Sequence, residues 1–248
     1  MKFYPINLNL KNRKILIVGA GRVALRKFKQ LLKAGAEIKI VSPEFNQGFA
    51  TYFGREQQPG SYYFSERKFK EKDLLGQFLV FAATDKRELN QRIARLARAQ
   101  NILINIIDDP ELSDFTVPAS VERGELLLTV SSGSNLPALS KNIKEKLACE
   151  FGIEYQILLE IMKKRRVQLI AEIDEISERR EIFRKLASDQ FLEKIREIVK
   201  QSNLDLSEFK EIAEIYSSQS KISSLELEQI FTKVEAEIDK IIAELRDD

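Results

Sequence analysis

The sequence predicts an α/β chain in three parts: a parallel, doubly wound sheet, a small α+β unit, and an all-helical carboxyl-terminal region. Three observations support this fold class. Short aliphatic runs alternate with helical segments as far as Pro110, which is the rhythm of βαβ units. All ten glycines and all six prolines lie at or before Gly152. Beyond Gly152, charged and aliphatic residues recur at helical spacing, which favours an amphipathic bundle.

In the first part, hydrophobic periodicity predicts each element in turn. Uninterrupted β-branched and aliphatic residues are typical of strands that are covered on both faces. The predicted elements are, in order, a strand at 14–18, a helix at 22–34, strands at 37–42, 62–64 and 78–82, a helix at 88–99 and a strand at 102–106.

After Pro110 the rhythm changes. Two strand-like runs, 115–122 and 126–131, meet at a glycine turn and predict a hairpin, and a helix over 136–149 follows. This unit is too thin to bury both of its faces, so we expect it to pack against a second copy in a homodimer. The expected domains are 1–112, 113–150 and 151–248.

Composition and charge narrow the classes of function. The 248 residues are 44% hydrophobic with a formal net charge of +2, so no overall field favours nucleic acid or a membrane surface. No apolar run approaches the ~20 residues that span a bilayer, and the start has no signal-peptide pattern. The single cysteine, Cys149, excludes an internal disulfide framework and indicates a reducing, cytoplasmic compartment. We expect Cys149 to be a packed thiol.

Histidine is absent from the sequence. Its absence excludes a Ser-His-Asp triad, a histidine general base and a histidine metal site. We therefore predict no tightly held metal, and a carboxylate becomes the main option for acid–base chemistry.

A glycine turn follows the first predicted strand and opens the first predicted helix. Gly19 allows the tight turn, Gly21 lets the backbone approach a diphosphate, and Ala24 permits close packing of helix on strand. The helix amino terminus then faces the anion. This context favours a dinucleotide-binding Rossmann domain over an ordinary β–turn–α unit.

An acidic residue for the adenosine ribose is expected at the tip of the second strand. Pro43 and Glu44 stand there, slightly beyond the usual position. A carboxylate that reaches the ribose 2′-hydroxyl disfavours the 2′-phosphate of NADP. The expected cofactor is therefore NAD.

Two polar clusters follow later strands at the same edge of the sheet. Asn105 stands near the end of the strand at 102–106, and Asp108 and Asp109 come just after it. Paired carboxylates in such a crevice are candidates for acid–base work. A simple turn explains Asp-Asp-Pro equally well. Thr84 ends the preceding strand, where it can face a cofactor or help to cap the next helix.

A third cluster spans Ser131 to Pro137 and leads into a helix. It is either a second anion-binding loop or a capped helix start. Nearby basic residues, Arg123 and Lys141 among them, suit a substrate with several carboxylates, although each can also be an ordinary surface charge.

Taken together, these clusters resemble the precorrin-2 dehydrogenase/ferrochelatase family, which forms the amino-terminal module of siroheme synthase. The resemblance is close over about residues 3 to 150. The matching segments are Tyr4 to Leu8, Lys14 to Arg26, Val41 to Glu44, Phe81 to Asp85, Asn105 to Pro110, Phe115 to Pro118, and Val130 to Gly133 followed by Pro137-Ala-Leu.

This resemblance implies that NAD⁺ accepts a hydride from precorrin-2, giving sirohydrochlorin in a protein that dimerises after its Rossmann domain. It implies NAD contacts at Arg22, Val23, Pro43, Glu44 and Thr84, in addition to the glycine turn. Asp108 corresponds to the key catalytic group, and Ser132 to a modifiable serine of the substrate cleft. The expected substrate-binding residues are Asn105, Arg123, Ser131, Ser132 and Lys141.

Two further possibilities stay open on the sequence. Fe²⁺ as a substrate, inserted into sirohydrochlorin, needs only an approach path and a base. Alternatively, the chain is a non-catalytic NAD-sensing or scaffold module of tetrapyrrole synthesis.

Overall fold

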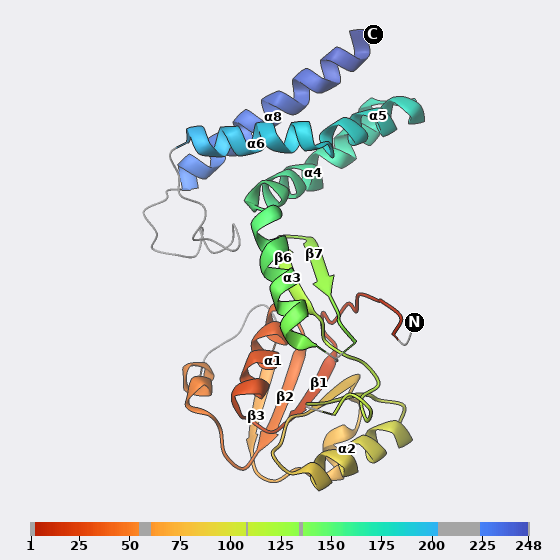
Figure 1. The fold of residues 1–248 in the computed structure, drawn as a ribbon, viewed down its shortest axis with the longest axis vertical. Coiled ribbons are helices and arrows are strands. Elements are labelled where there is room, and N and C mark those ends of the chain that lie inside the picture. Colours follow the sequence, from red (N-terminus) through yellow and green to blue (C-terminus); the bar gives the residue numbers. More distant parts are fainter. Residues whose placement is uncertain (1–2, 55–60, 108, 134–135, 203–223, 248) are drawn as a thin grey trace. The chain divides into compact units, whose positions relative to one another are not determined.

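The chain divides into two compact units, Met1–Val117 and Pro118–Asp248. The computed structural model describes residues 3–54, 61–107, 109–133, 136–202 and 224–247. Figure 1 traces both units, the first in red to yellow and the second in green to blue.

The first unit is built on a five-stranded parallel sheet, as predicted. The strand order is β3-β2-β1-β4-β5, with the first strand at the centre and the crossovers on either side. Aliphatic residues of β1 are buried on both faces, which explains its unbroken apolar sequence. The strands are β1 (Lys14–Val18), β2 (Glu37–Ser42), β3 (Ser61–Glu66), β4 (Leu79–Ala82) and β5 (Leu103–Ile106).

Helices cover both faces of this sheet. On one face, α1 (Arg22–Lys33) and the 3₁₀ helix η1 (Gln47–Tyr52) form a core around Phe28. On the other, α2 (Arg87–Ala99) and the 3₁₀ helix η2 (Glu71–Leu74) form a core around Ile93. The predicted doubly wound α/β fold is confirmed.

A buried ion pair ties η2 to the β2–β3 side of the sheet. Asp73, 1% exposed, accepts hydrogen bonds from Arg67 at 2.6 and 2.8 Å, from Lys39 Nζ at 2.8 Å and from the Lys70 N–H at 2.9 Å. The hydrogen-bonded Arg67 guanidinium holds the pKa of Asp73 well below its usual range. Asp73 is therefore ionised in the folded protein well into the acid range.

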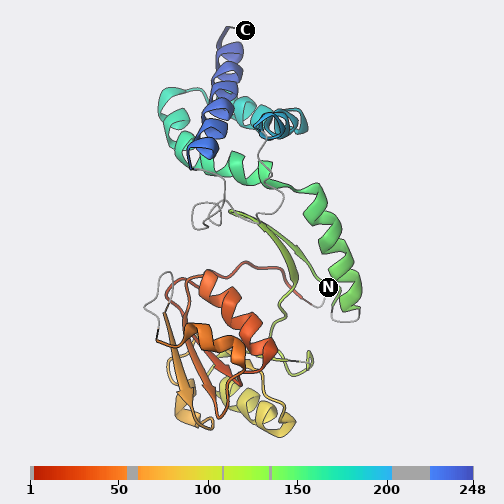
Figure 2. The same ribbon diagram turned by 90° about the vertical axis from the view of Figure 1, so that its left-hand side faces the viewer.

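The second unit begins with the antiparallel hairpin β6 (Ala119–Arg123) and β7 (Leu126–Val130), followed by α3 (Pro137–Glu150). Figure 2 shows α3 beside these two strands. The predicted strand 115–122 is wrong over its first four residues. Phe115 packs instead against Phe81 of β4, with ring centroids 5.6 Å apart, and residues 115–117 belong to the first unit.

The described residues that follow α3 fold mainly into helices, as predicted. These helices share one apolar core that includes Ile157, Leu186, Ile195 and Val234. Cys149, near the end of α3, is exposed, so the expectation of a packed thiol is wrong. No helix among the described residues is long and apolar enough to cross a membrane. The helices are α4 (Ile153–Glu172), α5 (Ile176–Leu186), α6 (Asp189–Gln201) and α8 (Ser224–Asp247).

Candidate functional site

The turn after β1 passes so close to the end of β4 that only glycine fits. Gly19 has φ +101°, and a Cβ there would lie 2.4 Å from the Ala83 carbonyl oxygen. The Gly19 N–H donates to the Val41 carbonyl at 2.9 Å, and the Ala83 N–H to the Val18 carbonyl at 2.8 Å. The turn is thus fixed between the carboxyl ends of β2 and β4.

The start of α1 is open. Gly21 is its N-cap, with φ −77°, and no described atom lies within 4 Å of the position that a Cβ would take. Within the described residues, no side chain caps this helix start and its first turn holds no acidic residue. Free N–H groups and the positive end of the helix dipole therefore face outward beside exposed Arg22. This surface fits the diphosphate of a dinucleotide.

The loop after β2 is held beside this turn. The Asn46 N–H donates to the Ala20 carbonyl at 2.9 Å, and the Ser42 hydroxyl donates to the Glu44 carbonyl at 2.6 Å. These bonds fix the backbone and leave the Pro43 and Glu44 side chains exposed. Glu44 can therefore meet a ligand that extends from the glycine turn towards β2.

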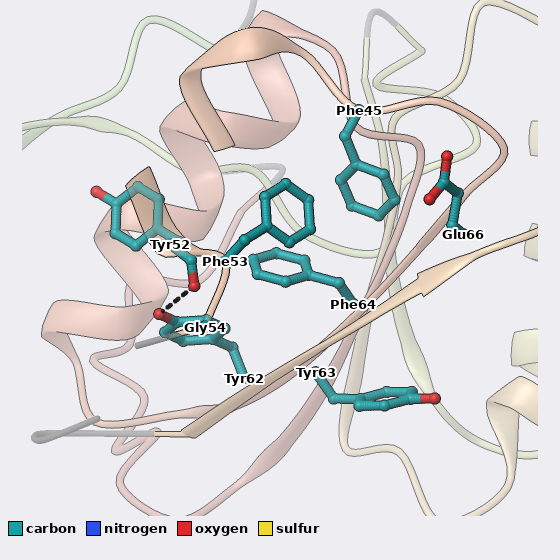
Figure 3. Close-up of a pocket in the computed structure, with 8 residues that line it drawn as sticks. All are labelled: Phe45, Tyr52, Phe53, Gly54, Tyr62, Tyr63, Phe64 and Glu66. Atoms are coloured by element: carbon teal, nitrogen blue, oxygen red, sulfur yellow. Dashed lines mark hydrogen bonds between the residues drawn. The ribbon is translucent and has the colours of Figure 1, made fainter. Parts of the chain in front are cut away.

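A cavity of about 340 Å³ lies farther along, on the β3 side. Figure 3 shows Phe45 and Phe64 side by side in its lining, with Glu66 beside Phe45. Ser42 pairs with Glu66 in the sheet, which places this aromatic lining next to the Pro43–Glu44 loop. The full lining is Phe45, Tyr52, Phe53, Gly54, Tyr62, Tyr63, Phe64 and Glu66.

Thr84, after β4, is tied to the start of α2. Its hydroxyl lies 2.6 Å from the Asn90 Oδ1 and accepts from the Lys86 N–H at 3.2 Å, while the Asn90 amide donates to the Thr84 carbonyl at 2.9 Å. The helix N-cap is Lys86. Thr84 is thus held rigidly and half-buried at the sheet edge, and a cofactor contact by Thr84 stays a prediction.

The cluster after β5 includes one residue, Asp108, that lies outside the described residues. Beside it, the Asp109 carboxylate accepts from the Leu112 N–H at 3.2 Å and its carbonyl accepts from the Ser113 hydroxyl at 2.8 Å. The turn interpretation therefore explains Asp109. The Asn105 side-chain amide donates to the Phe115 carbonyl at 2.9 Å, so Asn105 has a structural partner already.

Sequence reasoning missed Lys27 of α1. Its ammonium lies 5.9 Å from the centre of the Phe81 ring, and burial, reinforced by the charge of Arg26, lowers the pKa of Lys27 to about 8. The signal was its spacing, because Lys27 follows buried Ala24 by three residues and so lies beside the apolar face of the helix.

The remaining predicted residues belong to the second unit. Arg123 donates to the carbonyls of Phe151, Ala148 and Glu122 at 2.8–2.9 Å and so caps the carboxyl end of α3. The Ser132 hydroxyl donates to the Leu136 carbonyl at 3.0 Å. Ser131, whose hydroxyl accepts from the Gly133 N–H at 3.4 Å, is exposed.

Lys141 projects from α3 with its side chain 78% exposed, 3.8 Å from Glu145. A pair this exposed leaves the ammonium available to a ligand. No group of three or more His, Cys, Asp or Glu side chains in the described ranges could hold a metal ion.

Comparison with known proteins gives a consistent set of similarities. Residues 6–119 match a family model described as "Putative NAD(P)-binding". The chain is 35% identical over 195 residues to the siroheme synthase of Nitrosomonas eutropha, a match covering 79% of this chain and 40% of that protein. It is 37% identical over 147 residues to siroheme synthase 3 of Aeromonas hydrophila, covering 59% and 31%.

The chain thus spans well under half the length of these curated relatives. Among solved structures it is similar to "SirC, precorrin-2 dehydrogenase", with a TM-score of 0.65 and 23% identity over 94% of this chain and all of the other. At that identity the likeness establishes the fold. The amino-terminal unit is accordingly an NAD(P)-binding domain.

Proposed function

We propose that this chain, which belongs to the family of siroheme synthase amino-terminal modules, is an NAD-dependent dehydrogenase that oxidises precorrin-2 to sirohydrochlorin. The observation that supports it most strongly is the glycine turn. Gly19 is forced to be glycine by the Ala83 carbonyl, and Gly21 leaves open space at a helix start. That geometry fits the diphosphate of a dinucleotide. The choice of a tetrapyrrole as the substrate rests on the similarity to siroheme synthases.

When bound, NAD⁺ supplies the hydride acceptor. In our proposal the backbone from Gly19 to Val23 and the Arg22 side chain hold its diphosphate. Glu44 accepts hydrogen bonds from the adenosine ribose and repels the 2′-phosphate of NADP, which favours NAD. The aromatic cavity beyond Phe45 offers the adenine an apolar surface, and Thr84 lines the edge after β4.

The oxidation removes a hydride and a proton from the substrate. We assign the removal of the proton to Asp108 as general base, because in a chain without histidine a carboxylate beyond the β5 strand is the available base. We assign substrate recognition to Asn105, Ser131, Ser132 and Lys141. Arg123 was predicted to join them, but its bonds to three carbonyls give it a structural role that accounts for its position.

We also propose that the hairpin and α3, which lie within the predicted unit 113–150, form the interface of a homodimer. A two-stranded sheet with one helix has little hydrophobic core of its own. Large apolar side chains therefore remain exposed on this part of the single chain. A second copy would cover them. They are Leu127 (43% exposed), Leu136 (54%), Leu139 (45%) and Ile143 (36%).

The test is NADH formation from precorrin-2 under anaerobic conditions. Wild-type protein should form NADH, and Asp108→Ala should slow it by about a hundredfold or more, the usual worth of a general base. Glu111→Ala, an exposed carboxylate in the same loop, is the matched control and should retain the wild-type rate.

Equal rates for Asp108→Ala and wild type would refute the assignment of the base. Tight NAD binding without turnover of precorrin-2 would favour the non-catalytic NAD-sensing or scaffold alternative. Adding Co²⁺ or Fe²⁺ after sirohydrochlorin has formed, and following its absorption band, measures metal insertion in the same sample.

A further inference from the structure

The amino-terminal segment has a strand pattern but no strand partner. Its apolar residues recur at every second position and alternate with proline and asparagine, a period of two that is typical of a half-buried strand. Only the last of them packs into the core of its own unit. They are Tyr4 (83% exposed), Ile6 (63%), Leu8 (39%) and Leu10.

The backbone of this segment is unpaired as well. In the part of the chain that the structure describes, the peptide groups of residues 4–8 make no hydrogen bond. Hydrogen bonding begins after this stretch, where the Lys11 N–H donates to the Asn9 Oδ1 at 3.1 Å. The Asn12 N–H then donates to the Gly35 carbonyl and the Arg13 N–H to the Leu10 carbonyl, each at 2.9 Å. Exposed apolar residues on an unpaired backbone are suited to strand addition.

The same chain has a sheet edge that lacks a strand. Among the described residues, β6 and β7 pair only with each other, and Leu127 of β7 is 43% exposed. The β5 edge of the larger sheet, in contrast, is covered. There the Asp114 N–H donates to the Ile104 carbonyl at 2.8 Å and its carboxylate accepts from the Ile104 N–H at 3.1 Å, which covers β5.

We propose that residues 4–9 add as a β-strand to the free edge of β7 in a second copy of this chain. This inference rests on the proposed homodimer. In a two-fold dimer every contact occurs twice. Because each chain carries both an unpaired arm and an unpaired strand edge, the arm of each copy can pair with the edge of the other. The added strand makes a three-stranded sheet from a marginal two-stranded one, and it continues the exposed apolar surface of Leu127 and α3.

Backbone hydrogen exchange of the full chain tests the arm directly. At concentrations where the protein is dimeric, the amides of residues 6–9 should exchange at least about tenfold more slowly than after dilution to monomer. Ile6→Asp should abolish this protection and shift the dimer–monomer equilibrium towards monomer. Asn7→Asp carries the same charge on the alternate face and is the matched control, which should keep both.

The outcomes separate the two proposals. A dimer whose residues 6–9 exchange as fast as in the monomer would overturn the arm and leave the homodimer intact. A monomer at all concentrations would overturn both. Protection that persists unchanged in the diluted monomer would overturn the second copy as the partner, because the arm would then pair within its own chain.

Discussion

Replacing Gly19 with alanine should destabilise the first unit, whereas replacing Gly21 should leave its stability almost unchanged. The two glycines stand two residues apart in one turn but differ in what a Cβ would meet. At Gly19 it would lie 2.4 Å from the Ala83 carbonyl oxygen and 2.7 Å from its carbon, at φ +101°. At Gly21 it would meet open space, at φ −77°.

The magnitude follows from two costs. An L-residue held at such a φ costs about 1–3 kcal/mol, and forcing atoms into a closely packed backbone costs about 1–3 kcal/mol more. Gly19→Ala should therefore lower the free energy of unfolding by about 3 kcal/mol. Gly21→Ala should change it by less than about 1 kcal/mol, because alanine adopts φ −77° without strain and loses only the better N-cap preference of glycine.

NAD binding should separate the variants in a second way. The Cβ of Gly21→Ala would stand where the proposed diphosphate approaches, and losing one hydrogen bond to a charged group costs about 1.5–3 kcal/mol. The Kd for NAD⁺ should then rise about tenfold or more. Urea-dependent hydrogen exchange of β1 and β4 reports stability, and calorimetric titration reports affinity. Wild-type stability in Gly19→Ala, or wild-type affinity in Gly21→Ala, would refute the reasoning.

Three further substitutions test other parts of the account. Glu44→Gln should reduce the preference for NAD⁺ over NADP⁺, measured as the ratio of their Kd values, by about tenfold; an unchanged ratio would exclude Glu44. Asp73→Asn should destabilise the chain by about 1–3 kcal/mol at neutral pH by removing the carboxylate that pairs Arg67 and Lys39. Because folding lowers the pKa of Asp73, this difference should shrink as pH falls below about 4; a constant difference in urea unfolding would contradict it. Arg123→Met should destabilise the carboxyl end of α3, so that the backbone amides of this helix exchange hydrogen faster than in the wild type. Unchanged exchange rates would contradict the capping role.

Local pattern was sufficient for the elements that form the sheet. The runs at β1 and β2 are β-branched and aliphatic, so they specify buried parallel strands, and the break at Gly19 locates the turn. The φ of +101° at Gly19 is the conformation that this turn requires. The sequence beyond Gly152, without glycine or proline, likewise predicts helices, and α4, α5, α6 and α8 form in its described residues.

Tertiary contacts decided what the sequence misjudged. Residues 115–118 have strand-like composition, but Phe115 packs against Phe81 and the hairpin begins only at Ala119. Arg123 has the sequence context of a surface cation, yet the end of α3 supplies two carbonyl acceptors, those of Ala148 and Phe151. The cavity lined by Phe45 and Phe64 combines residues from η1 and β3, and no local sequence period relates them. Which residues contact a substrate depends on how separate elements come together in the fold, and local sequence patterns do not contain that information.

The central claim is that the chain transfers a hydride from precorrin-2 to NAD⁺, and the ratio of the two products tests it most directly. Under anaerobic conditions, with NADH and sirohydrochlorin followed together by absorbance, the account predicts one NADH for each sirohydrochlorin formed and no sirohydrochlorin without NAD⁺. Sirohydrochlorin that appears at the same rate without NAD⁺, or no product with it, would contradict the account.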